Sequence, residues 1–153
     1  MAMFSSLDIA GSALTAERFR SDIVLQNIAN AETTKTESGE PYRRQQVVMQ
    51  DIPLSFEQEL KKASSGGTSA GTSTEVTRGG VQVTKVVKSD REFTKRYEPD
   101  NPDADADGYV SYPNVDKTEE MVDLMAASNA YEANLTALSV VKAMINKTLD
   151  MGK

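Results

Sequence analysis

The stretch DKTEEMVDLMAASNAYEANLTALSVVKAMINKTLDMG, residues 116–152, carries the clearest pattern in this chain. Asp116 is a preferred helix N-cap, with Glu119 three residues later, and Gly152 is a preferred stop. Between them, mostly apolar positions alternate three and four residues apart through four heptads. These positions are Met121, Leu124, Ser128, Tyr131, Leu135, Leu138, Lys142, Ile145 and Leu149. The spacing predicts one long amphipathic helix in a C-terminal unit, residues 116–153.

The N-terminal unit, residues 1–31, has a weaker version of the same pattern. Ser5 is a candidate N-cap, and Asp8 stands where a capping-box partner is expected, so a helix is predicted over 5–31. Apolar or small residues follow the heptad spacing, interrupted by Arg18. They are Leu7, Gly11, Leu14, Ser21, Leu25 and Ile28.

The middle of the chain, residues 32–115, contains only short elements. We expect a polar loop over 32–41, a strand over 42–49, a short helix or turn after Pro53, and a flexible Gly/Ser/Thr loop over 63–74. Residues 79–88 alternate in polarity and then change phase, which predicts a strand with a β-bulge. The chain then stays extended until Pro99 and Pro102. The predicted fold class is therefore α+β, mainly α, with a small central β subdomain.

Two long helices with so little between them must cover each other in a coiled-coil-like core. Each seam residue left in water forgoes about 1.5–3 kcal/mol of burial free energy. Because a lone helix pair leaves further apolar faces uncovered, we expect it to associate with other copies.

Composition excludes several classes of function. The 153 residues carry a formal net charge of −6, which disfavours nucleic acid as a partner. Neither cysteine nor histidine is present, so thiol chemistry, disulfides and the commonest general base are missing. We expect no cofactor and no catalytic residue.

The N-terminus and the hydropathy disfavour two other classes. MAMFSSLDIAGSAL lacks a basic region before its apolar run, so it does not match a cleavable secretory signal. No stretch approaches the roughly 20 apolar residues of a membrane span. We therefore expect no direct membrane insertion, and export by another route if the chain leaves the cytoplasm.

Asp103, Asp105 and Asp107, followed by Gly108, resemble the opening of a calcium-binding loop. Position 12 of such a loop is Asn114, which cannot replace the bidentate Glu. Flanking prolines also disfavour the two helices of an EF-hand. The segment is better interpreted as a turn, with a weak calcium-dependent binding module built on the three aspartates as the alternative.

Arg43 and Arg44 form the other candidate site. Adjacent residues of a strand point to opposite faces, so the two cannot grip one ligand together. Solvated charge is the default expectation, with contacts to a neighbouring subunit as the functional alternative.

Three separated motifs resemble one known family. NIANAETTKTESGEPYRRQQVV, YEPDNPDADADGYVSYPNVD and EMVDLMAASNAYEANLTALSVVKAMINKTLDMGK occur in the order found in the C-type rod proteins of the bacterial flagellar basal body. That resemblance covers nearly the whole chain. It implies a non-enzymatic subunit of the proximal rod, the drive shaft that crosses the periplasm and serves motility.

The resemblance also implies partners and a location. The partners would be copies of the chain itself, the B-type proximal subunit, the distal rod proteins and the protein that joins the rod to the MS ring. The subunit would leave the cell unfolded through the flagellar type III apparatus. Its segment 101–115 would lead into the C-terminal helix, with Tyr109, Tyr112 and Val115 packed on the terminal helices. The assembly interface would comprise the seam residues Leu7, Leu14, Leu25, Ile28, Met121, Leu124, Tyr131, Leu135, Leu138, Ile145 and Leu149.

Overall fold

The computed structural model describes residues 2–52 and 79–152. Its elements, in order, are α1 (Ala2–Ala29), β1 (Gln45–Asp51), β2 (Val81–Lys88), β3 (Thr94–Tyr97), β4 (Tyr109–Tyr112) and α3 (Lys117–Met151). The predicted fold class is confirmed: two long terminal helices pair with each other, and a small β region lies between them in the sequence. The predictions for the segment after Pro53 and for 63–74 lie outside the described residues.

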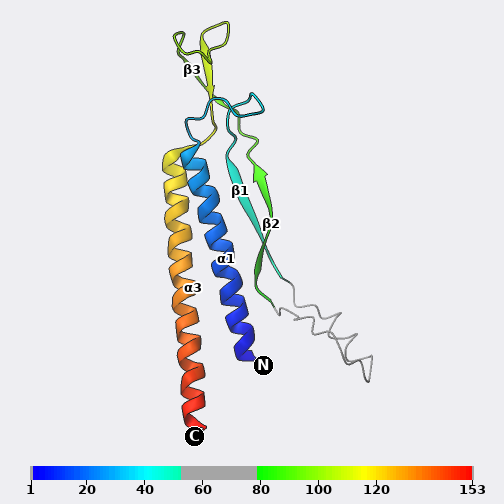
Figure 1. The fold of residues 1–153 in the computed structure, drawn as a ribbon, viewed down its shortest axis with the longest axis vertical. Coiled ribbons are helices and arrows are strands. Elements are labelled where there is room, and N and C mark those ends of the chain that lie inside the picture. The colour runs from blue at the N-terminus through cyan, green and yellow to red at the C-terminus, as the bar shows by residue number, and fades with distance from the viewer. Residues whose placement is uncertain (1, 53–78, 153) are drawn as a thin grey trace, which may run out of the picture.

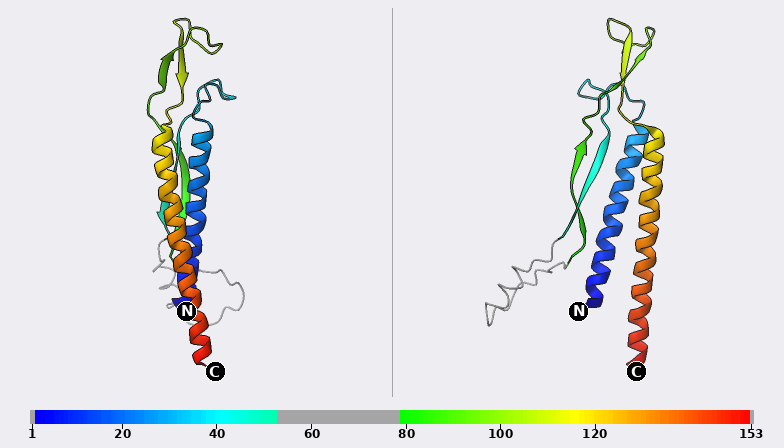
Figure 2. Two further views of the ribbon diagram at one scale, coloured as in Figure 1. Left: turned by 90° about the vertical axis from the view of Figure 1, so that its left-hand side faces the viewer. Right: turned by 180° about the vertical axis from the view of Figure 1, so that it is seen from behind.

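The helix pair forms the long axis of the molecule (Figure 1). α1 and α3 run antiparallel, and α3 extends past α1 at the end where both termini lie (Figures 1 and 2). Asp116 caps α3 as predicted, because its carboxylate accepts a hydrogen bond from the backbone N–H of Thr118 at 2.8 Å. Backbone N–H groups of Thr118 and Glu119 hold the pKa of Asp116 below its usual value.

The predicted start of the first helix is wrong. α1 begins at Ala2, so Ser5 lies inside the helix and is not its N-cap. Alanine and methionine favour helix, and residues 2–4 contain neither proline nor glycine to stop it. The helix therefore continues past the serine in the N-terminal direction.

β1 and β2 form an antiparallel ribbon, from Gln45 opposite Lys88 to Asp51 opposite Val81. The predicted bulge is confirmed: Val48 pairs with Lys85 and Met49 with Val83, which leaves Thr84 as an extra residue on β2. The ribbon lies beside α1, on the side away from α3 (Figures 1 and 2).

A close backbone contact joins the ribbon to α1. Ser12 Oγ accepts a hydrogen bond from the backbone N–H of Val81 at 3.1 Å. A Cβ at Gly80, where φ is +125°, would lie 2.5 Å from that Oγ, so the approach requires glycine.

β3 and β4 form a second hairpin, which projects beyond the helix ends (Figures 1 and 2). Its pairing places the Tyr109 ring against Tyr97, with centroids 5.4 Å apart. The Tyr112 hydroxyl donates to Glu98 at 2.9 Å. The expectation that Tyr109 and Tyr112 pack on the terminal helices is therefore wrong, because strand pairing directs both to β3 and its flank. Val115 is half-buried.

The buried helix faces coincide only in part with the predicted seams. The fully buried residues of α3 are Glu120 and Ala127, each one position before the seam residues Met121 and Ser128. Met121 and Leu135 are 54% and 48% exposed, whereas Leu124, Tyr131, Leu138 and Ile145 are half-buried. On α1 the buried residues are Ala10, Ala16, Val24 and Asn27, while Leu25 is 49% exposed.

The core of the described residues is thin. Its buried apolar side chains are mostly small: Ala10, Ala16, Val24, Ala31, Tyr42, Val110 and Ala127. Two of the three largest fully buried side chains are polar, those of Glu120 and Asn27. Hydrophobic burial among the described residues of one copy is therefore small. No helix among the described residues is long and apolar enough to span a bilayer.

Replacing Ala127 with leucine tests the helix contact. Ala127 is 0% exposed, so the larger side chain must push the helices apart and should lower the free energy of unfolding by about 1–3 kcal/mol. The control is the same change at the exposed neighbour Ala126. Urea titration followed by helical circular dichroism measures both, and equal effects would contradict this packing.

Candidate functional site: a buried polar cluster and an exposed helix face

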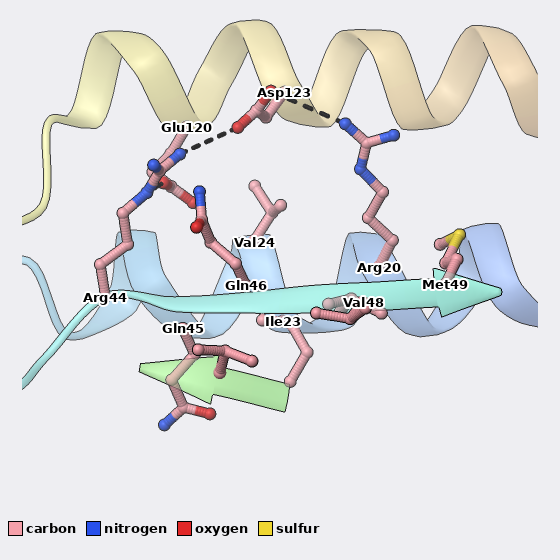
Figure 3. Close-up of a pocket in the computed structure, with 12 residues that line it drawn as sticks. Arg20, Ile23, Val24, Arg44, Gln45, Gln46, Val48, Met49, Glu120 and Asp123 are labelled. Atoms are coloured by element: carbon pink, nitrogen blue, oxygen red, sulfur yellow. Dashed lines mark hydrogen bonds and ion pairs between the residues drawn. The ribbon is translucent and has the colours of Figure 1, made fainter. Parts of the chain in front are cut away.

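Arg44 reaches from the start of β1 to the first turns of α3 (Figure 3). Its Nε donates to Glu120, and its Nη1 and Nη2 lie 3.1 Å and 3.0 Å from carboxylate oxygens of Glu119 and Asp123. The side chains of Arg44 and Glu120 are only 4% and 1% exposed. A buried charge must be paired to be tolerated, and here both are.

Asn27 joins α1 to the same cluster. Its amide nitrogen donates to Glu120 at 2.9 Å and to the carbonyl of Gln45 at 2.8 Å. Its amide oxygen accepts from the Tyr42 hydroxyl at 2.9 Å and from the backbone N–H of Gln45 at 3.0 Å. All four hydrogen-bonding positions of this buried amide are therefore satisfied.

Asn114 brings in the segment before α3. Its side-chain oxygen accepts from the backbone N–H of Arg44 at 2.9 Å, and its amide nitrogen donates to the carbonyl of Arg91 at 2.9 Å. The Arg91 guanidinium pairs with Glu119 at 3.0 Å. We call Arg44, Glu120, Asn27, Tyr42 and Asn114 the polar cluster. It ties together α1, the start of β1 and the entry into α3.

Within the polar cluster, the electrostatics favour a charged Arg44 and a neutral Tyr42. Burial alone would lower the pKa of Arg44, but the hydrogen bond and charge of Glu120, together with Glu119 and Asp123, raise it. Burial, and secondarily the charge of Glu120, raises the pKa of Tyr42. Tyr42 therefore remains a neutral donor to Asn27.

The expectation of solvated charge is wrong for Arg44. The two arginines do point in different directions, because Arg43 lies over the Phe93 ring at 4.5 Å while Arg44 turns to α3. Sequence reasoning also missed Asn27, Tyr42 and Glu120. Their only signal was indirect: Asn27 and Tyr42 lie within the first motif quoted above, and Glu120 begins the third.

A groove of about 490 Å³ opens beside the polar cluster, between α1, α3 and β1. Figure 3 shows Ile23 and Val24 on α1, Val48 and Met49 on β1, and the charged residues toward α3. An arginine of α1, Arg20, lies 3.7 Å from Asp123 across it.

The aspartate segment forms a turn, as interpreted from the sequence. Asn101 accepts from the backbone N–H of Asp103 at 3.1 Å, and Gly108 has φ of +82°. Asp103 accepts from Thr34 at 2.8 Å. Asp103, Asp105 and Asp107 belong to no group of three potential metal ligands in the described part of the chain, so nothing there favours the calcium alternative.

The outer face of α3 is rich in exposed apolar side chains. Leu149 and Met151, near its C-terminal end, are 65% and 78% exposed. Further exposed members, from N- to C-terminus, are Met121, Val122, Met125, Leu135, Val140 and Met144. So many exposed apolar side chains on one helix indicate contact with another chain.

Known proteins similar to this chain share one description. A family model described as "Flagellar basal body rod FlgEFG protein C-terminal" matches residues 106–151. The chain is similar to "Flagellar basal-body rod protein FlgC" of Bacillus subtilis (strain 168), with 44% identity over 100% of both chains. It is 42% identical to the protein of that name from Escherichia coli O157:H7, again over 100% of both. The corresponding protein of Borreliella burgdorferi is 37% identical over 97% of both.

The buried ion pair can be tested by removing one charge and then both. Arg44→Met leaves Glu120 buried without its cation, which should cost about 3–5 kcal/mol of unfolding free energy. The double variant R44M/E120M removes both charges and should recover much of that loss. Urea unfolding provides the measurement.

The matched control is Arg43→Met, at the adjacent and less buried arginine. An Arg44→Met variant no less stable than Arg43→Met would contradict the role given to the ion pair. A double variant as unstable as R44M would show that packing, rather than charge, holds the strand to α3.

Proposed function

This chain belongs to the family of flagellar basal-body rod protein FlgC, and we propose that its helix pair assembles side by side with copies of itself and with other rod subunits. The chain is a structural subunit of the basal-body rod and not an enzyme. What remains to be tested is which surfaces join the subunits, which subunits are neighbours, and how the chain reaches the rod.

The exposed apolar face of α3 is the observation that carries the proposal. Leu149 and Met144 are 65% and 58% exposed in one copy, and contact with another chain would remove them from solvent. Burial of such side chains contributes about 1.5–3 kcal/mol apiece. The seam residues Leu7, Leu14, Leu25, Ile28, Met121, Leu124, Tyr131, Leu135, Leu138, Ile145 and Leu149 remain the proposed interface. Those most exposed in one copy are the first candidates.

The neighbours proposed are the B-type proximal subunit, the distal rod proteins and the junction protein of the MS ring. Identical subunits joined by head-to-tail contacts that do not close a ring grow as a helix, as a shaft requires. We further propose export in an unfolded state through the flagellar type III apparatus. The thin core supports this, because small internal burial makes the isolated chain easier to unfold.

Truncation tests the role of α3. Removing residues 134–153 eliminates half of the helix and most of its exposed apolar side chains, while the polar cluster is retained. Incorporation into rods isolated from cells that lack their own copy should then be abolished. Removing only Gly152 and Lys153 is the control and should leave incorporation intact.

A second variant separates loss of the interface from loss of the fold. Met125→Gln, Met144→Gln and Leu149→Gln in one chain change only exposed positions, so helicity by circular dichroism should match that of the parent while incorporation falls. Normal incorporation of this triple variant would argue against the outer face of α3 as the interface.

A further inference from the structure

The position of α3 along α1 is weakly determined by apolar packing. Residues 30–116 separate the two helices, so no tight turn sets their alignment. In the described part of the pair, the buried apolar side chains are small ones, those of Ala10, Ala16, Val24 and Ala127. Because small side chains interlock less than large ones, packing alone gives little resistance when one helix shifts along the other.

Heptad spacing makes a shift of seven residues the main competing alignment, or register. Apolar residues recur at that interval on α3, so a shift of one heptad places one seam residue where another stood. Tyr131 would replace Leu124, and Leu138 would replace Tyr131. All three are half-buried. Hydrophobic attraction is non-directional, so it distinguishes poorly between the two registers.

The polar cluster does distinguish between these registers. Arg44 is held against α1, since Asn27 donates a hydrogen bond to the carbonyl of the next residue, Gln45, and accepts one from its backbone N–H. The carboxylates that pair with the Arg44 guanidinium stand on α3. They belong to Glu119, Glu120 and Asp123. The charge fixed on the α1 side is therefore matched at one position of α3.

A shift of one heptad would replace each of these three carboxylates by a methyl group. The residues seven positions further along α3 are Ala126, Ala127 and Ala130. The Arg44 side chain is only 4% exposed, so it would become a buried charge with no anion beside it. Asn27 would lose its carboxylate acceptor at the same time. An unpaired buried charge is strongly unfavourable.

A shift in the other direction is opposed for a different reason. Pro113 would then take the place of Glu120, but α3 begins only at Lys117, after the Asp116 cap. No turn of helix would stand beside Asn27. The buried cluster therefore fits α3 in its observed register and in neither neighbouring one.

The more exposed ion pairs between the helices select less strongly. Arg20 lies 3.7 Å from Asp123, and both side chains are 37% exposed. Glu32, just after α1, pairs with Lys117 at side-chain exposures of 78% and 50%. Solvent and salt weaken such pairs. The buried contacts of the polar cluster are therefore the main determinant of the register.

We propose that the polar cluster is a register lock, which selects one alignment of α3 along α1 from those that the heptads allow. Its ion pair adds little net stability, because desolvation offsets most of the attraction, but it makes each shifted register costly. A single buried polar residue can specify the register of a coiled coil in the same way. The inference concerns one chain, so it does not rest on the proposed assembly.

Distances between spin labels on the two helices test the proposal in the full-length chain. The chain contains no cysteine, so Thr15→Cys on α1 and Asn146→Cys on α3, both at exposed positions, provide the two labelling sites. A shift of seven residues moves one label along the helix axis by about 10 Å. The parent should show one distance. R44M/E120M, which removes the lock, should add a second population displaced by up to that amount. Dilution with unlabelled chain removes distances between copies.

Moving the carboxylates by one heptad is a sharper test. A variant with E119A/E120A/D123A and A126E/A127E/A130D keeps a charged partner for Arg44 but places it seven residues further along α3. The register should follow the carboxylates, so the label distance should shorten as a single population by up to about 10 Å. Because Arg44 again has anions beside it, helicity by circular dichroism should match that of the parent.

Two controls carry the same labels. Arg43→Met changes the neighbouring arginine and should keep the single parent distance. Glu120→Gln retains a side-chain oxygen that can accept from Asn27 and leaves Arg44 with Glu119 and Asp123, so it should keep that distance too. The proposal is overturned if R44M/E120M folds with the parent distance alone. It is equally overturned if the variant with moved carboxylates keeps the parent distance or loses its helices. Neither measurement uses rods, so these outcomes are independent of whether the chain assembles as proposed.

Discussion

The buried ion pair between Arg44 and Glu120 determines how the pieces of this fold fit together. α1 separates the β1–β2 ribbon from α3 over most of their lengths (Figure 1). Among the described residues no strand packs along α3, and the Arg44 side chain bridges that distance. Because each charge is almost fully buried, neither can move away without a large desolvation cost. The start of β1 is therefore fixed relative to the first turn of α3.

The rest of the polar cluster follows from that pair. Glu120 has a second oxygen to satisfy, and Asn27 of α1 supplies the donor. The remaining groups of Asn27 then bind Tyr42 and the backbone of Gln45, which return the chain to β1. Three segments far apart in sequence thus satisfy one another in a small volume. Hydrogen bonds are directional, so this cluster fixes one relative orientation of helices and ribbon.

The sequence predicted the elements better than the faces they present. Heptad spacing, the Asp116 cap and the phase change before Val86 were sufficient to predict both helices, the end of α3 and the bulged strand. Those signals depend on neighbours in sequence. The predicted seams match the buried faces only in part, because the most buried helix positions include Asn27 and Glu120, and a count of apolar residues cannot place polar side chains inside. Arg44 was misread because its partners lie more than 70 residues away in the sequence. The pairing of β3 with β4 was missed because no short turn of a recognised type connects them.

A partly polar interior combined with exposed apolar side chains on α3 has a physical consequence for a shaft subunit. Hydrophobic attraction is non-directional and grows with the area buried. A subunit that buries its apolar residues in its own core therefore has few left to contact its neighbours. This chain fixes its internal geometry with charges and amides, and leaves methionine, leucine and valine on the outer face of α3. Net stability from a buried ion pair is small, since desolvation offsets most of the attraction. The described part of the subunit therefore has a defined arrangement, and under the proposed assembly the larger hydrophobic gain comes when subunits stand side by side.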